Sequence, residues 1–206
     1  YTDRETLEIA EKVLVTEVNK SIVDHLNNAG SYALGLHSLG SCVLFAQRMY
    51  LKGAAGERVD LGYVGDVVEV NTVLLEALTE DGYIPVIAPV AIARDGSDNG
   101  VFKLNVNADT AAGHVAAALK AEKLVVLSDT HGIRTNPDQP ESYASTLTRK
   151  EIDGLVRKGV IGEGMLPKVE ACLIAIAAGA PKAHHIDRRG SHSPPAEIST
   201  DAGIGA

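Results

Sequence analysis

Three short segments of the sequence carry side chains that could do chemistry. The first contains Asn105 and Asn107, whose amide groups can donate hydrogen bonds to a carboxylate or amide ligand. Asp109 follows in the predicted first turn of a helix, where it could orient nearby ammonium groups. The plainer interpretation of Asp109 is compensation of the helix dipole, which is the usual role of a first-turn aspartate. The segment therefore predicts either a site for a carboxylate or amide ligand or an ordinary helix start.

The other two segments are suited to phosphate chemistry. Lys168 lies in the first turn of a second predicted helix, where backbone amides and an ammonium group could together face a transferring phosphoryl group. Asp129 and Gly132 follow a short apolar strand, at the end of the strand where open α/β sheets usually bind ligands. The alternatives are that Lys168 is a solvated surface lysine and that the segment with Asp129 and Gly132 is a simple turn. Cys172 is interpreted as a core residue, because it has no basic neighbour to lower the pKa of its thiol.

Alternating helices and apolar strands must position these segments. Helices are expected from a Thr2–Glu5 capping box, after Asn71, from Asn107 or Asp109, from a Thr148–Glu151 capping box and over 165–179; strands are expected at 32–36, 84–88 and 124–127. Residues 51–60, 94–100 and 129–141 are predicted to be loops or turns. This order predicts an α/β protein with a mainly parallel sheet, and a break near residue 90 would divide it into two lobes.

Composition excludes several classes of protein. The chain has 206 residues, of which 45% are hydrophobic and only 4% aromatic, so its core must be packed with aliphatic side chains. A net charge of -8 gives no basic surface for nucleic acid or anionic lipid. Two cysteines cannot form a disulfide framework or a four-ligand zinc site, which fits a reducing cytosol. The longest nearly apolar stretch, residues 83–93, is too short to span a membrane.

The common catalytic signatures are also missing from the sequence. It contains no Gly-x-x-x-x-Gly-Lys-Ser/Thr phosphate loop, no Gly-x-Ser-x-Gly nucleophile elbow and no His-Glu-x-x-His zinc pair. His184 and His185 are adjacent, and neighbouring residues on a strand point to opposite faces. The two rings are therefore not expected to share an ion, and no metal-ligating residues are predicted.

Taken together, the segments resemble the acetylglutamate kinases, which are members of the amino acid kinase family. Six ordered motifs carry the resemblance: residues 2–8 (TDRETLE), 18–20 (VNK), 60–67 (DLGYVGDV), 84–89 (IPVIAP), 105–113 (NVNADTAAG) and 167–172 (PKVEAC). The resemblance implies a three-layer αβα sandwich with a mainly parallel open sheet. It also implies that residues 1–90 are the remainder of an acetylglutamate-binding lobe and that residues 91–206 are an ATP-binding lobe.

The resemblance further implies an activity and its setting. Members of this group use ATP and Mg²⁺ to phosphorylate the γ-carboxylate of N-acetyl-L-glutamate in arginine biosynthesis. By the same resemblance we expect a cytoplasmic homo-oligomer, either a dimer or a hexamer, and a PII-type signal protein as a candidate partner. The chemistry agrees with direct transfer, because a carboxylate is already ionised near neutral pH and needs no general base.

Individual roles are carried over by matching motifs. Asn105 matches the asparagine that holds acetylglutamate, Asp109 the aspartate that organises the catalytic lysines, and Lys168 the lysine that stabilises the transferring phosphoryl group. Asn107 is a second candidate for substrate binding because of its amide group. The matching nucleotide contacts are Asp129, Gly132 and Gly162, and the candidate arginine-effector residues are His184, Glu197 and Gly203.

Departures from the family pattern leave alternatives open. The Lys-x-Gly-Gly motif of the amino-terminal lobe does not occur in the chain, so we expect a preceding segment before Tyr1. Glu163 places a carboxylate beside the phosphate path, and Pro194–Pro195 interrupts an apolar run between the effector residues. One alternative is a non-catalytic member that binds nucleotide or arginine. Another is a carbamate kinase or aspartokinase relative, which the motifs at 105–112 and 167–171 disfavour.

Overall fold

The computed structural model describes residues 1–38, 40–53, 55–94, 103–130, 132–139, 142–162 and 164–187. Contacts divide the chain into two compact units, Tyr1–Ala111 and Ala112–Ala206. This boundary differs from the expected break near residue 90, because β6 (Lys103–Val106) pairs with β3 (Arg58–Val70) and β5 (Val90–Ala93) and so belongs to the first unit. The separate functions expected of the two parts remain predictions.

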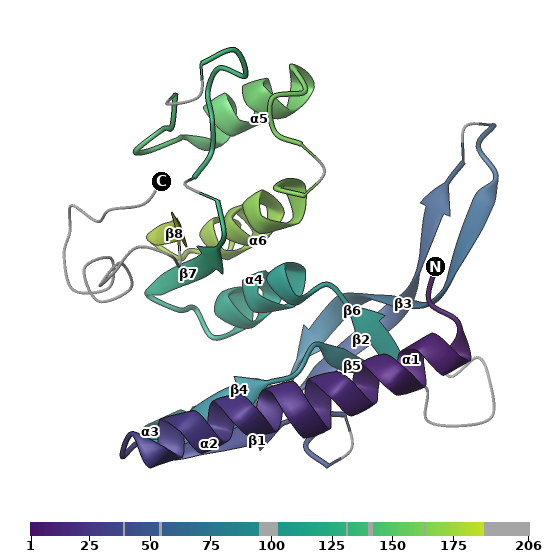
Figure 1. The fold of residues 1–206 in the computed structure, drawn as a ribbon, viewed down its shortest axis with the longest axis vertical. Coiled ribbons are helices and arrows are strands. Elements are labelled where there is room, and N and C mark those ends of the chain that lie inside the picture. The colour runs from purple at the N-terminus through teal and green to yellow at the C-terminus, as the bar shows by residue number, and fades with distance from the viewer. Residues whose placement is uncertain are drawn as a thin grey trace. The chain divides into compact units, whose positions relative to one another are not determined.

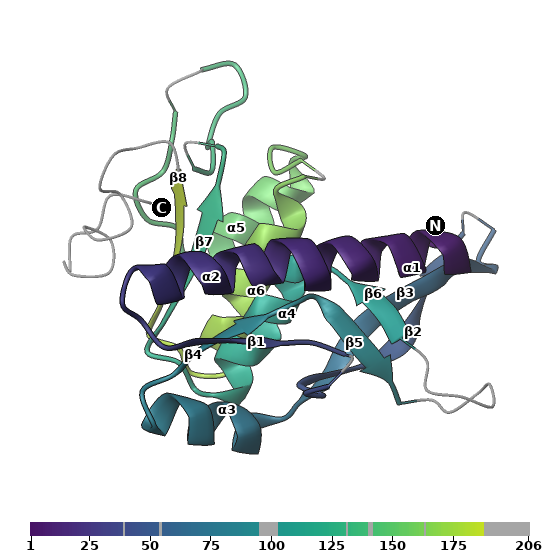
Figure 2. The ribbon, with the colours of Figure 1, turned by 60° about the horizontal axis from the view of Figure 1, so that its bottom comes forward.

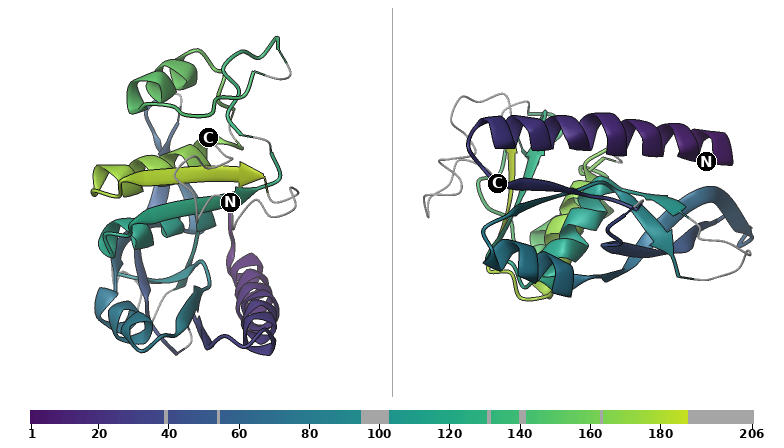
Figure 3. Two further views of the ribbon diagram at one scale, coloured as in Figure 1. Left: turned by 90° about the vertical axis from the view of Figure 1, so that its left-hand side faces the viewer. Right: turned by 90° about the horizontal axis from the view of Figure 1, so that it is seen from below.

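Helices lie on both sides of a short parallel strand pair in the first unit. β1 (Ala33–Leu36) pairs with β4 (Ile84–Ile87), close to the strands expected at 32–36 and 84–88. α1 (Arg4–Glu11), the π-helical η1 (Lys12–Asn19) and α2 (Lys20–Asn28) form one continuous helix on one side of this pair, and α3 (Thr72–Glu80) lies on the other (Figures 2 and 3). Leu36 and Leu75 are almost completely buried between these layers.

The helix starts follow local capping chemistry. Asn71 caps α3 as expected, because its Oδ1 accepts a hydrogen bond from the Leu74 backbone at 3.3 Å. The capping box expected at Thr2 and Glu5 is wrong. Asp3 is the cap of α1 and accepts from Thr6 N at 2.8 Å, which lowers the pKa of the Asp3 carboxyl. Thr2 is instead buried and pairs through its backbone with the strand around Gly62.

Four strands of the first unit form a closed barrel in the order β2-β3-β6-β5, where β2 is Leu44–Lys52. β2 and β3 form a long antiparallel hairpin (Figure 1), so the loop expected over 51–60 is wrong at residues 51–52 and 58–60, which belong to the two strands. The hairpin is polar and exposed at its tip, which hides the two-residue periodicity of a strand. Arg58 lies 3.4 Å from the centre of the Tyr50 ring and helps to hold the two strands together.

A half-buried polar cluster joins three parts of the first unit. The Glu11 carboxylate, at the end of α1, accepts hydrogen bonds from Ser38 Oγ at 2.7 Å and from Lys103 Nζ at 2.8 Å. Ser38 follows β1 and Lys103 begins β6, the strand that carries Asn105. The Glu11 and Lys103 side chains are only 14% and 25% exposed, so water screens this ion pair weakly.

We expect Glu11→Gln to lower the free energy of unfolding by about 1–3 kcal/mol, because the variant leaves the partly buried Lys103 ammonium without its counter-charge. Urea unfolding would measure the change. Glu8→Gln is the matched control, since the Arg4–Glu8 pair on the same helix is 81% and 65% exposed and should contribute less than about 0.5 kcal/mol. Equal effects of the two substitutions would show that the Glu11 cluster has no special structural role.

The second unit packs helices on a two-stranded parallel sheet. β7 (Lys123–Ser128) and β8 (Lys182–Asp187) pair in parallel, and β7 contains the strand expected at 124–127. α4 (Ala108–Ala118), which crosses the unit boundary, and α6 (Leu166–Ala177) share an aliphatic core with this sheet. The core consists of Ala116, Leu124, Val126, Ala171, Ala175 and Ala180. It fits the aliphatic packing expected from the scarcity of aromatic residues.

Small residues let two helices of the second unit approach closely. A Cβ atom on Gly113 of α4 would lie 2.7 Å from the carbonyl oxygen of Ala171 in α6, and Ala171 itself is completely buried. α5 (Arg149–Arg157) begins at the expected capping box, in which Thr148 N donates to the Glu151 carboxylate at 2.7 Å and Glu151 N donates to Thr148 Oγ1. The Thr148 hydroxyl also donates to this carboxylate at 2.7 Å, and this bond, together with the one from Thr148 N, lowers the pKa of Glu151.

The pairing pattern agrees with the predicted α/β class. Four of the six pairings between named strands of the described chain are parallel, namely β1–β4, β2–β5, β3–β6 and β7–β8. The barrel with its two antiparallel pairings is a feature that the predicted open sheet did not include. No helix in the described ranges is both long and apolar enough to cross a membrane.

Candidate functional site

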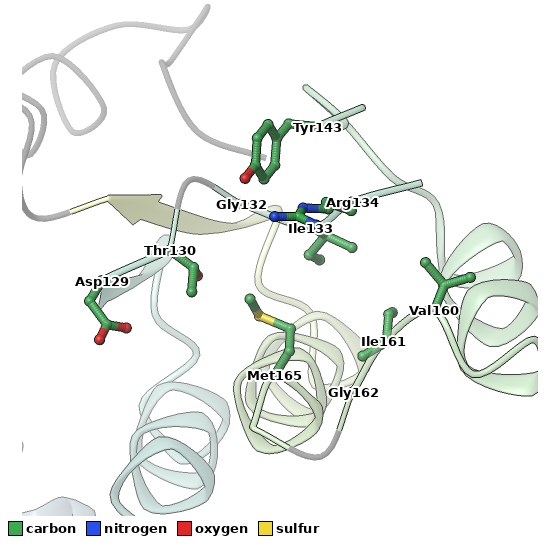
Figure 4. Close-up of a pocket in the computed structure, with 10 residues that line it drawn as sticks. All are labelled: Asp129, Thr130, Gly132, Ile133, Arg134, Tyr143, Val160, Ile161, Gly162 and Met165. Atoms are coloured by element: carbon green, nitrogen blue, oxygen red, sulfur yellow. The ribbon is translucent and has the colours of Figure 1, made fainter. Parts of the chain in front are cut away.

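A pocket of about 440 Å³ lies in the second unit (Figure 4). Its lining comes from the segment after β7 and from the turn before α6: Asp129, Thr130, Gly132, Ile133, Arg134, Tyr143, Val160, Ile161, Gly162 and Met165. The three residues expected to contact a nucleotide, Asp129, Gly132 and Gly162, therefore line one cavity although they are distant in the sequence. Its volume is in the usual range for small-molecule sites.

The first wall of the pocket is shaped by hydrogen bonds within the segment after β7. The Ser128 and Thr130 hydroxyl groups are 3.0 Å apart and fix the exit from the strand. Gly132 has a φ of 131°, a left-handed conformation that favours glycine. The chain then folds back on itself, with Thr135 N donating to the Ser142 carbonyl at 2.8 Å and Ala144 N donating to that of Ile133 at 3.0 Å. The described residues of the loop expected over 129–141 form no helix or strand apart from the isolated bridge of Arg134 with Tyr143, which folds the segment into a small hairpin.

The second wall is the turn that leads into α6. The Gly162 carbonyl accepts hydrogen bonds from Met165 N at 3.0 Å and from Leu166 N at 3.1 Å, which closes the turn against the helix start. Pro167 occupies the first turn, where a missing backbone N–H leaves no helical hydrogen bond unmade. The Met165 side chain points into the pocket (Figure 4). Glu163 lies outside the described residues.

Lys168 and the asparagine–aspartate segment occupy different units. Lys168 is half-buried in the first turn of α6 and is not part of the pocket lining. In the first unit, Asn105 is half-buried on β6, between its strand partners Val64 and Val90. Asn107 Oδ1 accepts from Thr110 N at 3.0 Å and so stabilises the start of α4, while Asp109 lies in the first turn. The Asn107 Oδ1 is thus used at the helix start, whereas its amide nitrogen, the donor group of the side chain, can donate to a ligand.

The candidate effector residues are described only in part. His184 lies half-buried on β8, where burial lowers the pKa of its imidazole and the charges of Lys123 and Lys182 lower it further. His185 is the next residue on the same strand and is buried. Glu197 and Gly203 lie outside the described residues, as do Pro194 and Pro195. Among the residues that the structure describes, no group of three or more His, Cys, Asp or Glu side chains could hold a metal ion.

Comparison with known protein families decides the classification. The profile of the amino acid kinase family matches residues 1–186. The chain belongs to the amino acid kinase family. The curated amino acid kinases that it resembles include the acetylglutamate kinase of Methanothrix thermoacetophila, 46% identical over 204 residues, and that of Symbiobacterium thermophilum, 44% identical over 205 residues. These matches cover 99% of this chain, and 69% and 68% of the respective relatives.

Solved structures confirm the fold class. The smu.665 protein of Streptococcus mutans UA159 is 28% identical, with a TM-score of 0.72 over 89% of this chain and 69% of the other. N-acetylglutamate synthase from Neisseria gonorrhoeae, solved with coenzyme A and N-acetyl-glutamate, has a TM-score of 0.78 at 22% identity and covers 98% of this chain and 43% of the synthase. The second similarity concerns the fold alone. The amino acid kinase fold predicted from the sequence is thus confirmed.

Proposed function

We propose that this amino acid kinase uses ATP to phosphorylate the γ-carboxylate of N-acetyl-L-glutamate, a step of arginine biosynthesis in the cytoplasm. The observation that carries the proposal is the 46% identity to an acetylglutamate kinase over 99% of the chain. A change of substrate class within the family would be expected to alter the motifs at 105–113 and 167–172, which fit the acetylglutamate kinase pattern. The non-catalytic alternative is disfavoured by the same similarity.

The pocket of the second unit is the proposed ATP site. Gly132 and Gly162 leave room for a ligand close to the backbone, and the carboxylate of Asp129 can accept hydrogen bonds from hydroxyl groups of the nucleotide. Mg²⁺ would supply positive charge to the phosphate chain. It is usually held by one or two carboxylates together with substrate phosphates and water, and the described lining of the pocket offers only Asp129, which is assigned to the nucleotide hydroxyl groups.

The proposed roles of the remaining residues follow from charge and hydrogen bonding. Asn105 and the amide nitrogen of Asn107 bind acetylglutamate, whose ionised γ-carboxylate attacks the terminal phosphorus of ATP without a general base. The Lys168 ammonium stabilises the negative charge of the transferring phosphoryl group. Asp109 orients the ammonium groups around that charge, and therefore acts as a positioning residue.

The same proposal includes assembly and regulation. The continuous α1–α2 helix exposes four aliphatic side chains, Ile9, Val13, Val18 and Ile22. Their spacing of four, five and four residues follows one face of a helix whose middle section has the wider π-helical turn. This stripe supports a homo-oligomer, either a dimer or a hexamer, with the stripe as a contact surface. Arginine binding by His184, Glu197 and Gly203, and a PII-type partner, remain proposals based on the sequence.

Acyl phosphate formation tests the proposed function. The protein expressed from its complete coding sequence should form an acyl phosphate with ATP, Mg²⁺ and N-acetyl-L-glutamate, which hydroxylamine traps as a coloured hydroxamate. Aspartate and free glutamate serve as comparison substrates and should give little product. Product with aspartate alone would indicate an aspartokinase-like activity. Nucleotide binding without any hydroxamate would favour the non-catalytic alternative.

A further inference from the structure

Two residues of the pocket have no role in the proposal so far. Arg134 is the only cation among the described residues that line the pocket, and Tyr143 is the only aromatic residue among them. The Arg134 guanidinium carbon lies 5.7 Å from the centre of the Tyr143 ring, within the range of a cation–π contact. Neither residue was singled out from the sequence, because their contact depends on how the segment after β7 folds back.

The hairpin after β7 holds this pair in place. Arg134 and Tyr143 form an antiparallel backbone bridge. The bridge is flanked by hydrogen bonds from Thr135 N to Ser142 O and from Ala144 N to Ile133 O, and Ser142 Oγ donates to the Asn136 carbonyl at 2.7 Å. The backbone of Arg134 is therefore held by hydrogen bonds on both sides of the bridge, and its side chain is exposed.

The chemistry around Arg134 differs from that at the other end of the pocket. Arg134 lies beside Tyr143 and Ile133, and faces a cavity whose other walls carry Met165 and Ile161 (Figure 4). Asp129 and Thr130 lie together on the opposite side. An apolar slot with one planar cation suits a flat aromatic ring, whereas the hydroxyl and carboxylate groups suit the sugar.

We propose that Arg134, supported by Tyr143, contacts the base of the bound nucleotide and contributes to its affinity. The inference rests on the proposed function, which places a nucleotide in this pocket. A guanidinium can stack on the face of a heteroaromatic ring, and lysine cannot replace it in that geometry. The proposal therefore assigns Arg134 to the base and not to the phosphate chain.

Equilibrium binding of ATP and adenosine distinguishes these two positions. We expect Arg134→Met to weaken the binding of both ligands by a similar factor, roughly five- to tenfold, measured by displacement of a fluorescent ATP analogue. Arg134→Lys should behave in the same way, because it keeps the charge but loses the planar group. Arg149→Met is the matched control, since Arg149 is exposed at the start of α5 and does not line the pocket; it should bind both ligands like the parent protein.

A double-mutant cycle tests the role of Tyr143. Tyr143→Leu should weaken binding several-fold, and the double variant should lose less than the product of the two single losses, because Tyr143 acts through Arg134. Circular dichroism of each variant would verify that the fold is retained. If Arg134→Met weakens the binding of ATP but not of adenosine, Arg134 contacts the phosphates and the inference is wrong. It is also wrong if Arg134→Met leaves both affinities unchanged, or if the losses of Arg134→Met and Tyr143→Leu simply multiply in the double variant. If the parent protein binds neither ligand, the proposed nucleotide site fails together with it.

Discussion

Lys168→Ala is expected to lower the rate of acyl phosphate formation by at least about a hundredfold, which is the usual loss when one preorganised charge at the transferring group is removed. The physical reason is that negative charge on the phosphoryl oxygens must be balanced in the transition state. Lys168 does not line the pocket proposed for ATP, so the affinity for ATP should change much less than kcat. Steady-state hydroxamate assays with acetylglutamate and ATP would separate kcat from KM.

Lys150→Ala provides the matched control for Lys168→Ala. Lys150 also lies in the first turn of a helix, α5, but it is exposed and lines neither the pocket nor the Gly113–Ala171 contact. Its replacement should leave kcat within about twofold, since exposed charges contribute little. Equal activity of the Lys168→Ala and parent proteins would remove Lys168 from the phosphoryl-transfer site, whatever the fate of the nucleotide pocket.

Local chemistry explains which parts of the fold could be predicted. The caps at Asn71 and Thr148 and the proline at position 167 act over one helical turn, and the structure places all three at helix starts. Thr2 failed as a cap because its backbone pairs with a distant strand, which local sequence does not reveal. The β2–β3 hairpin was missed for a related reason, since its polar tip is stabilised by contacts such as Arg58 with Tyr50.

The lining of the candidate pocket could be predicted only where a motif pointed to it. Resemblance assigned Asp129, Gly132 and Gly162 to one nucleotide, and the structure places all three around one pocket. Spacing alone could not join them, because the intervening hairpin and α5 bring the segments together. Arg134 and Tyr143 had no sequence signal of their own, since their contact depends on the register of that hairpin.

Gly113→Ala is expected to lower the free energy of unfolding by about 2–3 kcal/mol, near the upper end of the usual cost of overpacking. A Cβ atom at this position would meet the backbone of Ala171, which cannot move aside as a flexible side chain can. The closest atoms would be the Ala171 carbonyl oxygen at 2.7 Å and its Cα at 2.8 Å. The two helices would have to separate, which would loosen the aliphatic core around Ala116 and Ala175.

Gly154→Ala serves as a control that separates the effect of the α4–α6 contact from the effect of alanine on helix propensity. Gly154 lies inside α5, and a Cβ atom added to it would meet no atom of the described chain within 4 Å, so Gly154→Ala should stabilise the protein by up to about 1 kcal/mol. Alanine is favoured over glycine equally in both helices, and the difference between the two variants in urea unfolding therefore measures the α4–α6 contact.

Because α6 also carries Lys168, Gly113→Ala should reduce kcat below the unfolding temperature while Gly154→Ala leaves it unchanged. Two variants of equal stability would mean that α4 and α6 do not approach closely at this glycine.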